Sequence, residues 1–209
     1  MHMPIATIID IIGSKRMPSD ERKRIIDIVD MVIKSVNKLE KHSIKSALMA
    51  YPAITGGDSL EILAKKSEPI LYILHQLLMR DIPIRLGIGI GKIDILKRSA
   101  DECDGPAFWA ARQALEEGQK NKANAWVIAH ESSELWEALE AKSLGLVFLL
   151  LERMSLEQRR YCFYYIWEDM KLKEIAKKEG VSVSNVSQIV KKTNCRSLKH
   201  LIFGFKIMK

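Results

Sequence analysis

The order of apolar and amphipathic segments constrains the fold of this 209-residue chain more than any single motif does. Over residues 5–131, short apolar runs typical of strands alternate with helical patterns in the order β-α-β-β-α-β-α-β. Beyond about residue 143, only helical patterns follow. This order predicts a layered α/β (α+β) domain with a mixed sheet over residues 1–145, and an all-α domain over residues 146–209.

The net charge of the chain changes near the same boundary, at about residue 150. Residues 151–209 contain 13 lysines and arginines against 6 acidic residues, which gives a net charge of +7. The other 20 basic and 20 acidic residues lie in residues 1–150 and cancel. A basic unit joined to a neutral one indicates binding of a polyanion, although a solvated basic surface would have the same composition.

Residues 171–194 have the layout of a helix-turn-helix motif. Ile175 and Ala176 face inward on the first helix, and Gly180 permits the turn before the second. We therefore expect binding to double-stranded DNA, with a homodimer as the usual way to reach two major grooves. The alternative is a helical hairpin used only for dimer contact. The candidate DNA-binding residues all carry groups that hydrogen-bond base edges or phosphates: Ser182, Ser184, Asn185, Ser187, Gln188, Lys191, Lys192, Asn194 and Arg196.

Two glycines precede Asp58 between the apolar stretches 46–55 and 59–66. Gly-Gly-Asp supplies the positive φ angles that a tight hairpin needs. Asp10 ends the first apolar run of the chain, so a hairpin beside that run would bring two carboxylates together. Such carboxylates repel each other unless a cation lies between them, and Mg²⁺ with a nucleoside triphosphate is the usual occupant. A purely structural turn is the alternative.

Residues 82–93 predict a strand with an unusual face. Gly87, Gly89 and Gly91 alternate with apolar residues and leave one side of this strand without side chains. We expect something to approach the backbone closely there. Arg85 on the same strand could reach a phosphate, but a surface ion pair is the expected use.

The cysteines and histidines do not suggest a metal centre. Cys103, Cys162 and Cys195 are widely spaced, which favours reduced cysteines in a cytoplasmic protein and argues against structural zinc. The histidines have no metal-ligand spacing, and His75 is expected to be a packing residue. No apolar run approaches the roughly 20 residues of a membrane-spanning helix, so no membrane partner is expected.

Four ordered segments, IIDIIGSK, GGDSLEIL, RLGIGIGKI and DGPAFWAARQAL, resemble the SatD-like family, and the resemblance extends over nearly the whole chain. The same segments are similar, more distantly, to the palm domains of class III nucleotide cyclases and GGDEF diguanylate cyclases. Residues 155–190 resemble the last region of sigma factors and the output domains of response regulators. These resemblances imply a ferredoxin-like palm domain followed by a helix-turn-helix domain.

The resemblance to cyclases also implies a two-metal site. Asp10 and Asp58 would be catalytic residues that hold Mg²⁺ or Mn²⁺, with the Ile11 carbonyl as a further metal contact. The amides of Gly13 and Ser14 would approach the triphosphate of a bound nucleotide.

The same resemblance makes Arg112, in the segment AAR, the residue that steadies the transition state. The chain departs from both cyclase patterns, however. Ser59 stands where GGDEF enzymes carry a second acidic residue, and Phe108 and Trp109 occupy the neighbourhood of a cyclase asparagine. These departures favour nucleotide binding over efficient turnover.

Three functions agree with these features. The first is a DNA-binding transcriptional regulator whose N-terminal domain senses a metal–nucleotide ligand. The second is a nucleotidyl cyclase or related phosphoryl-transfer enzyme that uses its basic domain for localisation. The third is a structural module of a larger assembly, without either activity.

Overall fold

The computed structural model describes residues 3–37, 42–130 and 135–203. Five strands form one sheet in the order β2-β3-β1-β4-β5. Strand β1 pairs antiparallel with both β3 and β4, whereas β5 pairs parallel with β4, so the predicted mixed sheet is confirmed. The strands are β1 (Ile5–Ile11), β2 (Ala53–Thr55), β3 (Ser59–Ala64), β4 (Ile84–Ile90) and β5 (Ala125–Ala129).

The order β4-β1-β3-β2 is that of a ferredoxin-like β-α-β-β-α-β unit, to which β5 adds one edge. Strand β2 is the other edge and is short, because Pro52 cannot donate to a ladder hydrogen bond. The helices of this unit are α1 (Ser19–Asn37), α2 (His42–Lys45), α3 (Glu68–Leu78), α4 (Pro106–Lys120) and α5 (Leu135–Glu152), with the 3₁₀ turns η1 (Ser14–Arg16) and η2 (Ala100–Glu102).

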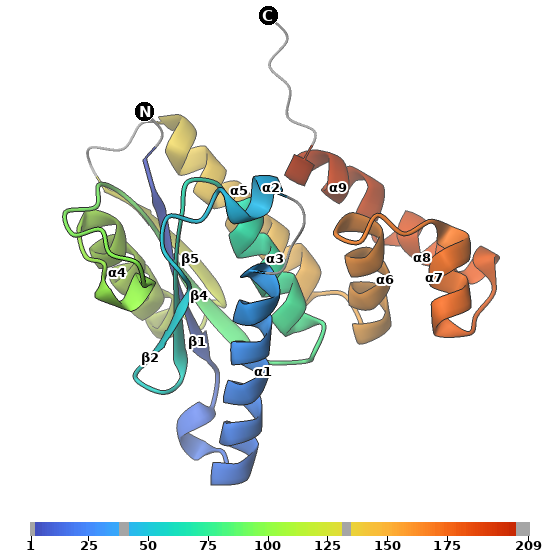
Figure 1. The fold of residues 1–209 in the computed structure, drawn as a ribbon, viewed down its shortest axis with the longest axis horizontal. Coiled ribbons are helices and arrows are strands. Elements are labelled where there is room, and N and C mark those ends of the chain that lie inside the picture. Colours follow the sequence, from blue (N-terminus) through green and yellow to red (C-terminus); the bar gives the residue numbers. More distant parts are fainter. Residues whose placement is uncertain (1–2, 38–41, 131–134, 204–209) are drawn as a thin grey trace, which may run out of the picture.

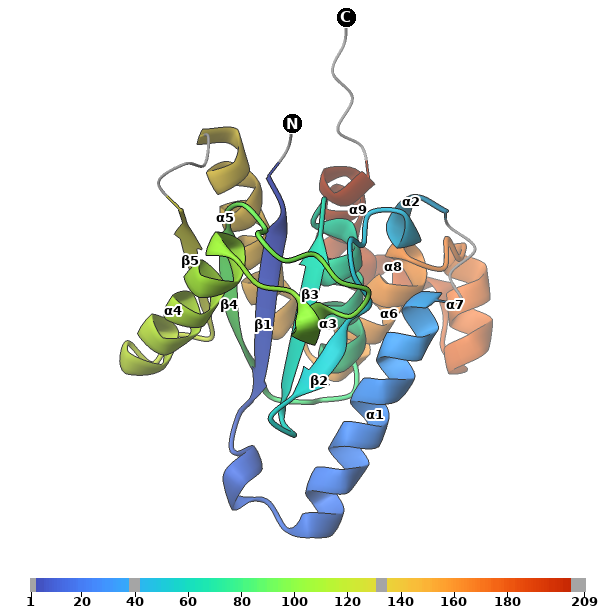
Figure 2. The ribbon, with the colours of Figure 1, turned by 60° about the vertical axis from the view of Figure 1, so that its left-hand side comes forward.

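Helices cover both faces of the sheet. Figures 1 and 2 show α4 on one side, with α1 and α3 on the other. Strand residues alternate between the two sides: Ile9 and Leu60 belong to the large core beneath α1, α3 and α5, whereas Ile8 and Leu63 pack with residues of α4. Asp10 shares the parity of Ile8, so its side chain lies on the α4 side of the sheet.

The glycine face of β4 is where α4 packs. A Cβ atom at Gly87 would lie 2.2 Å from the Ala111 carbonyl oxygen, and one at Gly89 would lie 2.1 Å from the Ala107 carbonyl oxygen. The expectation of a close approach is therefore confirmed, and the approaching group is the backbone of a helix. This packing fixes α4 relative to β1 and β4.

The C-terminal part is all-helical, as predicted, and consists of α6 (Leu156–Ile166), α7 (Leu172–Glu179), α8 (Val183–Lys192) and α9 (Cys195–Phe203). It packs against α3 rather than standing apart (Figure 1). Helix α5 spans the proposed boundary at residue 145 and packs on β4, β5 and α3. The exact boundary stays a prediction, because one core runs through both parts.

His75 lies at the centre of this contact. It is fully buried, its Nδ1 accepts a hydrogen bond from the Trp167 indole N–H at 3.0 Å, and its Nε2 lies 2.8 Å from the Arg159 carbonyl oxygen. This pair of partners fits the neutral tautomer that carries its proton on Nε2. Burial lowers the pKa of His75 to about 4. The histidine is thus a packing residue, as expected.

The expectation of reduced cysteines is wrong for one pair. A disulfide joins Cys162 of α6 to Cys195 of α9, with their Cα atoms 5.5 Å apart, while Cys103 is free and buried. The two cysteines are 33 residues apart in sequence, and only the packing of α9 on α6 brings them together. None of the described helices is both long and apolar enough to cross a membrane.

Candidate functional site

The tip of the β2–β3 hairpin and the end of β1 form the candidate site. Gly56 and Gly57 have φ angles of +57° and +80°, which turn the chain so that Asp58 directly precedes β3. The Ile11 N–H donates to the Asp58 carbonyl oxygen at 3.3 Å, and Asp10 pairs with Ser59 across the two strands. The hairpin therefore lies directly beside the end of β1, as the sequence predicted.

The two aspartates interact electrostatically. Burial raises the pKa of Asp10 above its usual value, and the negative charge of Asp58 raises it further. Arg85 opposes this effect from β4, where its guanidinium lies 3.8 Å from the Asp10 carboxylate, and the Gln119 amide of α4 lies 3.5 Å away. Asp10 is thus a half-buried carboxylate whose ionised form is only partly stabilised by its neighbours.

The loop after β1 completes the arrangement. Gly13 has a φ of +81°, which lets the chain turn sharply into η1. The Ser14 hydroxyl then donates a 2.6 Å hydrogen bond to Asp58 Oδ2. The structure therefore brings four of the sequence-predicted residues together: Asp10, Gly13, Ser14 and Asp58.

Basic side chains surround this carboxylate pair. Lys15 is close enough to lower the pKa of Asp10, and the Arg22 guanidinium of α1 lies only 3.1 Å from where a Gly57 Cβ would stand. Arg85 is the third cation, and its Nε is buried without a hydrogen-bond partner among the described residues. Arg22 and Gln119 were not predicted as site residues, because only the fold brings α1 and α4 to the place where β1 ends and β3 begins.

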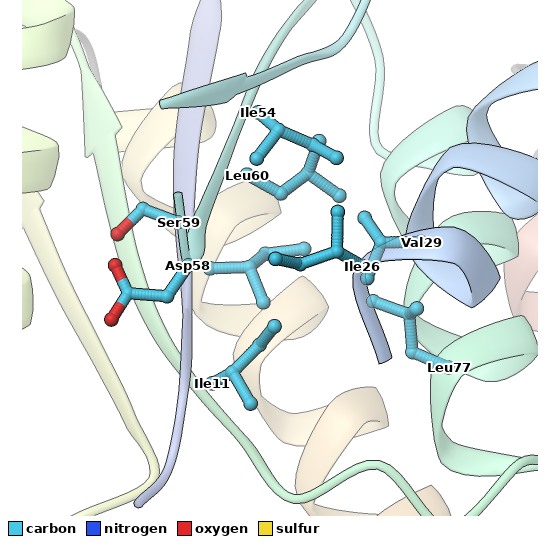
Figure 3. Close-up of a pocket in the computed structure, with 9 residues that line it drawn as sticks. Ile11, Ile26, Val29, Ile54, Asp58, Ser59, Leu60 and Leu77 are labelled. Atoms are coloured by element: carbon cyan, nitrogen blue, oxygen red, sulfur yellow. The ribbon is translucent and has the colours of Figure 1, made fainter. Parts of the chain in front are cut away.

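The side chains of Asp58 and Ser59 point away from the hydrophobic core. Figure 3 shows the carboxylate and the hydroxyl on one side, and Ile11, Ile26 and Val29 on the other. The cavity among these apolar residues is about 10 Å³, room for at most one water molecule. A ligand of this site must therefore bind on the polar side, over the sheet.

The two carboxylates could hold a metal ion whose other ligands are phosphate oxygens and water, and the nearby cations could hold the phosphate. The described residues contain no group of three or more histidine, cysteine, aspartate or glutamate side chains able to hold a metal. Mg²⁺ typically needs only one or two protein carboxylates when phosphate oxygens and water supply the rest. Asp10 and Asp58 match that donor set, and Lys15 and Arg22 match the charge of a phosphate group.

Arg112, the predicted transition-state arginine, lies on α4 about two helical turns before the residue that faces Asp10. Its guanidinium pairs with Asp104 at 3.3 Å, whereas Gln119, seven residues further along the same helix, faces Asp10. Seven helical residues correspond to about 10 Å. The structure does not place Arg112 beside the carboxylate pair, and its catalytic role stays a prediction.

Helix α8, its N-cap and the first residues after it, up to Arg196 of α9, carry the second group of predicted residues. Ser182 caps it by accepting a 3.1 Å hydrogen bond from the Asn185 N–H, while Val186 and Val190 are buried under α7 and α6. Within the described ranges, Lys191 and Lys192 have no ion-pair partner within 4.0 Å. All the candidate DNA-binding residues are exposed except Ser187, which is half-buried: Ser182, Ser184, Asn185, Gln188, Lys191, Lys192, Asn194 and Arg196.

The fold and this site define a class of protein: a ferredoxin-like α/β domain with two acidic residues where β1 ends and β3 begins, extended by a four-helix unit. The chain belongs to the SatD family, whose family model matches residues 4–140. The matched region includes the whole sheet and the start of α5, and helices α6 to α9 lie beyond it. A search of curated proteins found no match.

Proposed function

We propose that this chain is a DNA-binding regulator whose α/β domain binds a metal–nucleotide ligand. The observation that carries the proposal is the exposed polar face of α8, which follows a short turn after α7 and is capped by Ser182. In a helix-turn-helix protein the second helix enters the major groove with such a face. The net charge of +7 in residues 151–209 supplies attraction to phosphate.

DNA binding is tested by fluorescence anisotropy of a labelled mixed-sequence duplex. Lys191→Glu is expected to weaken binding at least tenfold, because it replaces a phosphate-binding cation with an anion. Lys65→Glu is the matched control, since it makes the same charge change at an exposed position on the sheet domain. Equal losses in the two variants would leave only a nonspecific charge effect and would contradict a role for α8.

The nucleotide part of the proposal rests on the carboxylate pair. Asp10 and Asp58 would hold Mg²⁺ or Mn²⁺, the Ile11 carbonyl would be a further contact, and Gly13 and Ser14 would lie near the phosphates. The raised pKa of Asp10 and the flanking cations support this arrangement. A thermal-shift screen of nucleoside triphosphates with either metal tests it: the wild type is expected to gain melting temperature and Asp10→Ala to lose that gain.

The same carboxylate pair favours one alternative, a nucleotidyl cyclase or related phosphoryl-transfer enzyme. In that case a bound triphosphate would be converted with release of pyrophosphate. Metal-dependent pyrophosphate release that Asp58→Asn abolishes would support the enzyme. Binding without release would support the sensor.

We also propose that the chain acts as a homodimer, and the exposed face of α5 is the surface that fits a second copy. Positions 135, 139, 146 and 149 follow the heptad spacing of a helix that packs against another helix. A dimer would present two copies of α8 to successive major grooves. Leu146→Glu is expected to yield a monomer in sedimentation equilibrium, whereas Met31→Glu on α1 is not. The exposed leucines of α5 are Leu135, Leu139, Leu146, Leu149 and Leu150.

A further inference from the structure

Glu61 is a buried carboxylate that the sequence motifs do not explain. It lies in the middle of β3, it is only 8% exposed, and no hydrogen bond from the described residues reaches its side chain. Burial raises its pKa, the charges of Asp101 and Asp104 add to that effect, and Arg112 opposes it. The fully buried side-chain oxygens and nitrogens without a partner among the described residues belong to Thr7, Glu68 and Arg85, so the Glu61 carboxylate still reaches solvent. Glu61 therefore keeps an oxygen that can accept a hydrogen bond from a ligand on this side of the sheet.

Glu61 faces the same side of the sheet as the carboxylate pair. Along β3, Ser59, Glu61 and Leu63 share one parity, and Leu63 packs with residues of α4. Because Glu61 pairs with Ile8 while Ser59 pairs with Asp10, Glu61 is a diagonal neighbour of Asp10. Such neighbours lie about 7–8 Å apart, which is one step further from the hairpin tip.

Arg112 does not neutralise Glu61 directly. The guanidinium is within the range at which it lowers the Glu61 pKa, but its ion pair is with Asp104. The Trp109 indole N–H also donates to Asp104, at 3.0 Å, and Trp109 is 52% exposed. Moving away from the hairpin, the α4 side of the sheet thus presents the carboxylate pair, then Glu61 with Arg112, then an exposed aromatic ring.

This order follows the order of parts in a nucleotide, which are phosphates, sugar and base. We propose that Glu61 accepts a hydrogen bond from a ribose hydroxyl of a nucleotide whose phosphates lie at Asp10 and Asp58. The inference rests on the proposed nucleotide site and adds the sugar specificity of that site. Carboxylates bind ribose hydroxyls in this way in dinucleotide-binding folds. The chain therefore selects ribonucleotides over deoxyribonucleotides, and Trp109 offers a surface for base stacking.

The test is a set of dissociation constants measured by calorimetry on the full chain with Mg²⁺. The probes are ATP and GTP, each with its 2′-deoxy and 3′-deoxy counterparts. The wild type is expected to bind at least one deoxy form tenfold or more weakly, because the deoxy ligand lacks the hydroxyl that donates to the Glu61 carboxylate. In Glu61→Met the ribonucleotide and its deoxy forms are expected to bind equally.

Two further variants keep the test decisive. Glu61→Gln covers the case in which the methionine variant does not fold, and it is expected to reduce the preference severalfold. Glu102→Gln, an exposed glutamate of η2, is the control and keeps the full preference. Nucleotide binding with no ribose preference, or with a preference that survives in Glu61→Met, would overturn the role of Glu61 alone. No binding of any triphosphate with Mg²⁺ or Mn²⁺ would overturn the nucleotide site as well.

Discussion

The sheet domain and the helical unit place their charged groups in opposite ways. In the sheet domain Asp10, Glu61 and Arg85 are half-buried or buried, and burial raises the pKa values of both carboxyl groups. In the helical unit most polar residues of α8 lie on the surface, and Lys191 and Lys192 are exposed. The first arrangement suits a small ligand that satisfies specific buried groups. The second suits an extended polyanion attracted by many weak contacts.

The two parts nevertheless share one core. Tyr72 and His75 of α3 pack against Phe163 and Trp167 of the helical unit, with ring centroids 5.2–5.6 Å apart. This contact fixes α6 of the helical unit on α3 of the sheet domain. Three features hold the two parts in this arrangement: the packing of α4 on β4, the disulfide between α6 and α9, and the contact between α3 and α6.

The largest expected loss of stability comes from disturbing the packing of α4 on the glycine face of β4. Gly89→Ala places a Cβ atom 2.1 Å from a backbone oxygen, so α4 must move, and the free energy of unfolding is expected to fall by about 4 kcal/mol or more. Gly145→Ala is the control, because its Cβ would meet nothing closer than 3.5 Å. That variant is expected to be neutral or up to about 1 kcal/mol more stable. Urea unfolding of both variants makes the comparison.

The disulfide between Cys162 and Cys195 should have the next largest effect on stability. Closing a loop of this length stabilises a folded protein by about 3–4 kcal/mol, so a reductant should lower the unfolding free energy by up to that amount. Cys162→Ala is expected to remove the response to reductant, whereas Cys103→Ala keeps it. Three free thiols in the denatured, unreduced protein would contradict the disulfide.

The contact between the two parts should weaken in acid. The pKa of His75 is about 4 in the folded protein and near 6.5 when unfolded, so between these values only the unfolded chain gains a proton. Stability is therefore full above pH 6.5 and falls by about 3 kcal/mol as the pH drops through 4. His75→Gln should flatten this dependence, and the exposed His200→Gln should not. Melting temperatures of the wild type and both variants between pH 7 and pH 4 measure this pH dependence.

The smallest effect is expected at the carboxylate pair. Because burial and Asp58 raise the pKa of Asp10, its ionised form lowers the stability of the ligand-free protein at neutral pH. Asp10→Asn should therefore raise the unfolding free energy by about 0.5–1 kcal/mol at pH 7, and the gain should vanish near pH 3. Asp94→Asn, an exposed aspartate, is expected to change nothing. A loss of stability in Asp10→Asn would mean that this carboxylate serves the fold.

The sequence predicted the features that depend on local patterns. The alternation of strands and helices, the Gly-Gly-Asp turn and the bare face at Gly87 and Gly89 are all present. Each follows from the conformational preferences of a few neighbouring residues, which are visible without the fold.

The features that depend on packing between distant segments were not predicted. Nothing near Cys162 in sequence indicates Cys195, and Arg22 reaches the site only because α1 returns across the hairpin. Glu61 did leave a signal, since it is a charged residue inside the apolar run 59–66. Without the strand register, the sequence does not show that Glu61 lies on the same side of the sheet as Asp10, so no function could be assigned to it.

The salt dependence of DNA binding by the full chain tests the central claim most directly. If α8 binds DNA, the logarithm of the association constant should fall linearly with the logarithm of salt concentration, and Lys191→Glu should make the slope shallower by about one unit. Lys65→Glu should leave the slope as it is. No measurable binding at 50 mM salt, or an unchanged slope in Lys191→Glu, would contradict the account.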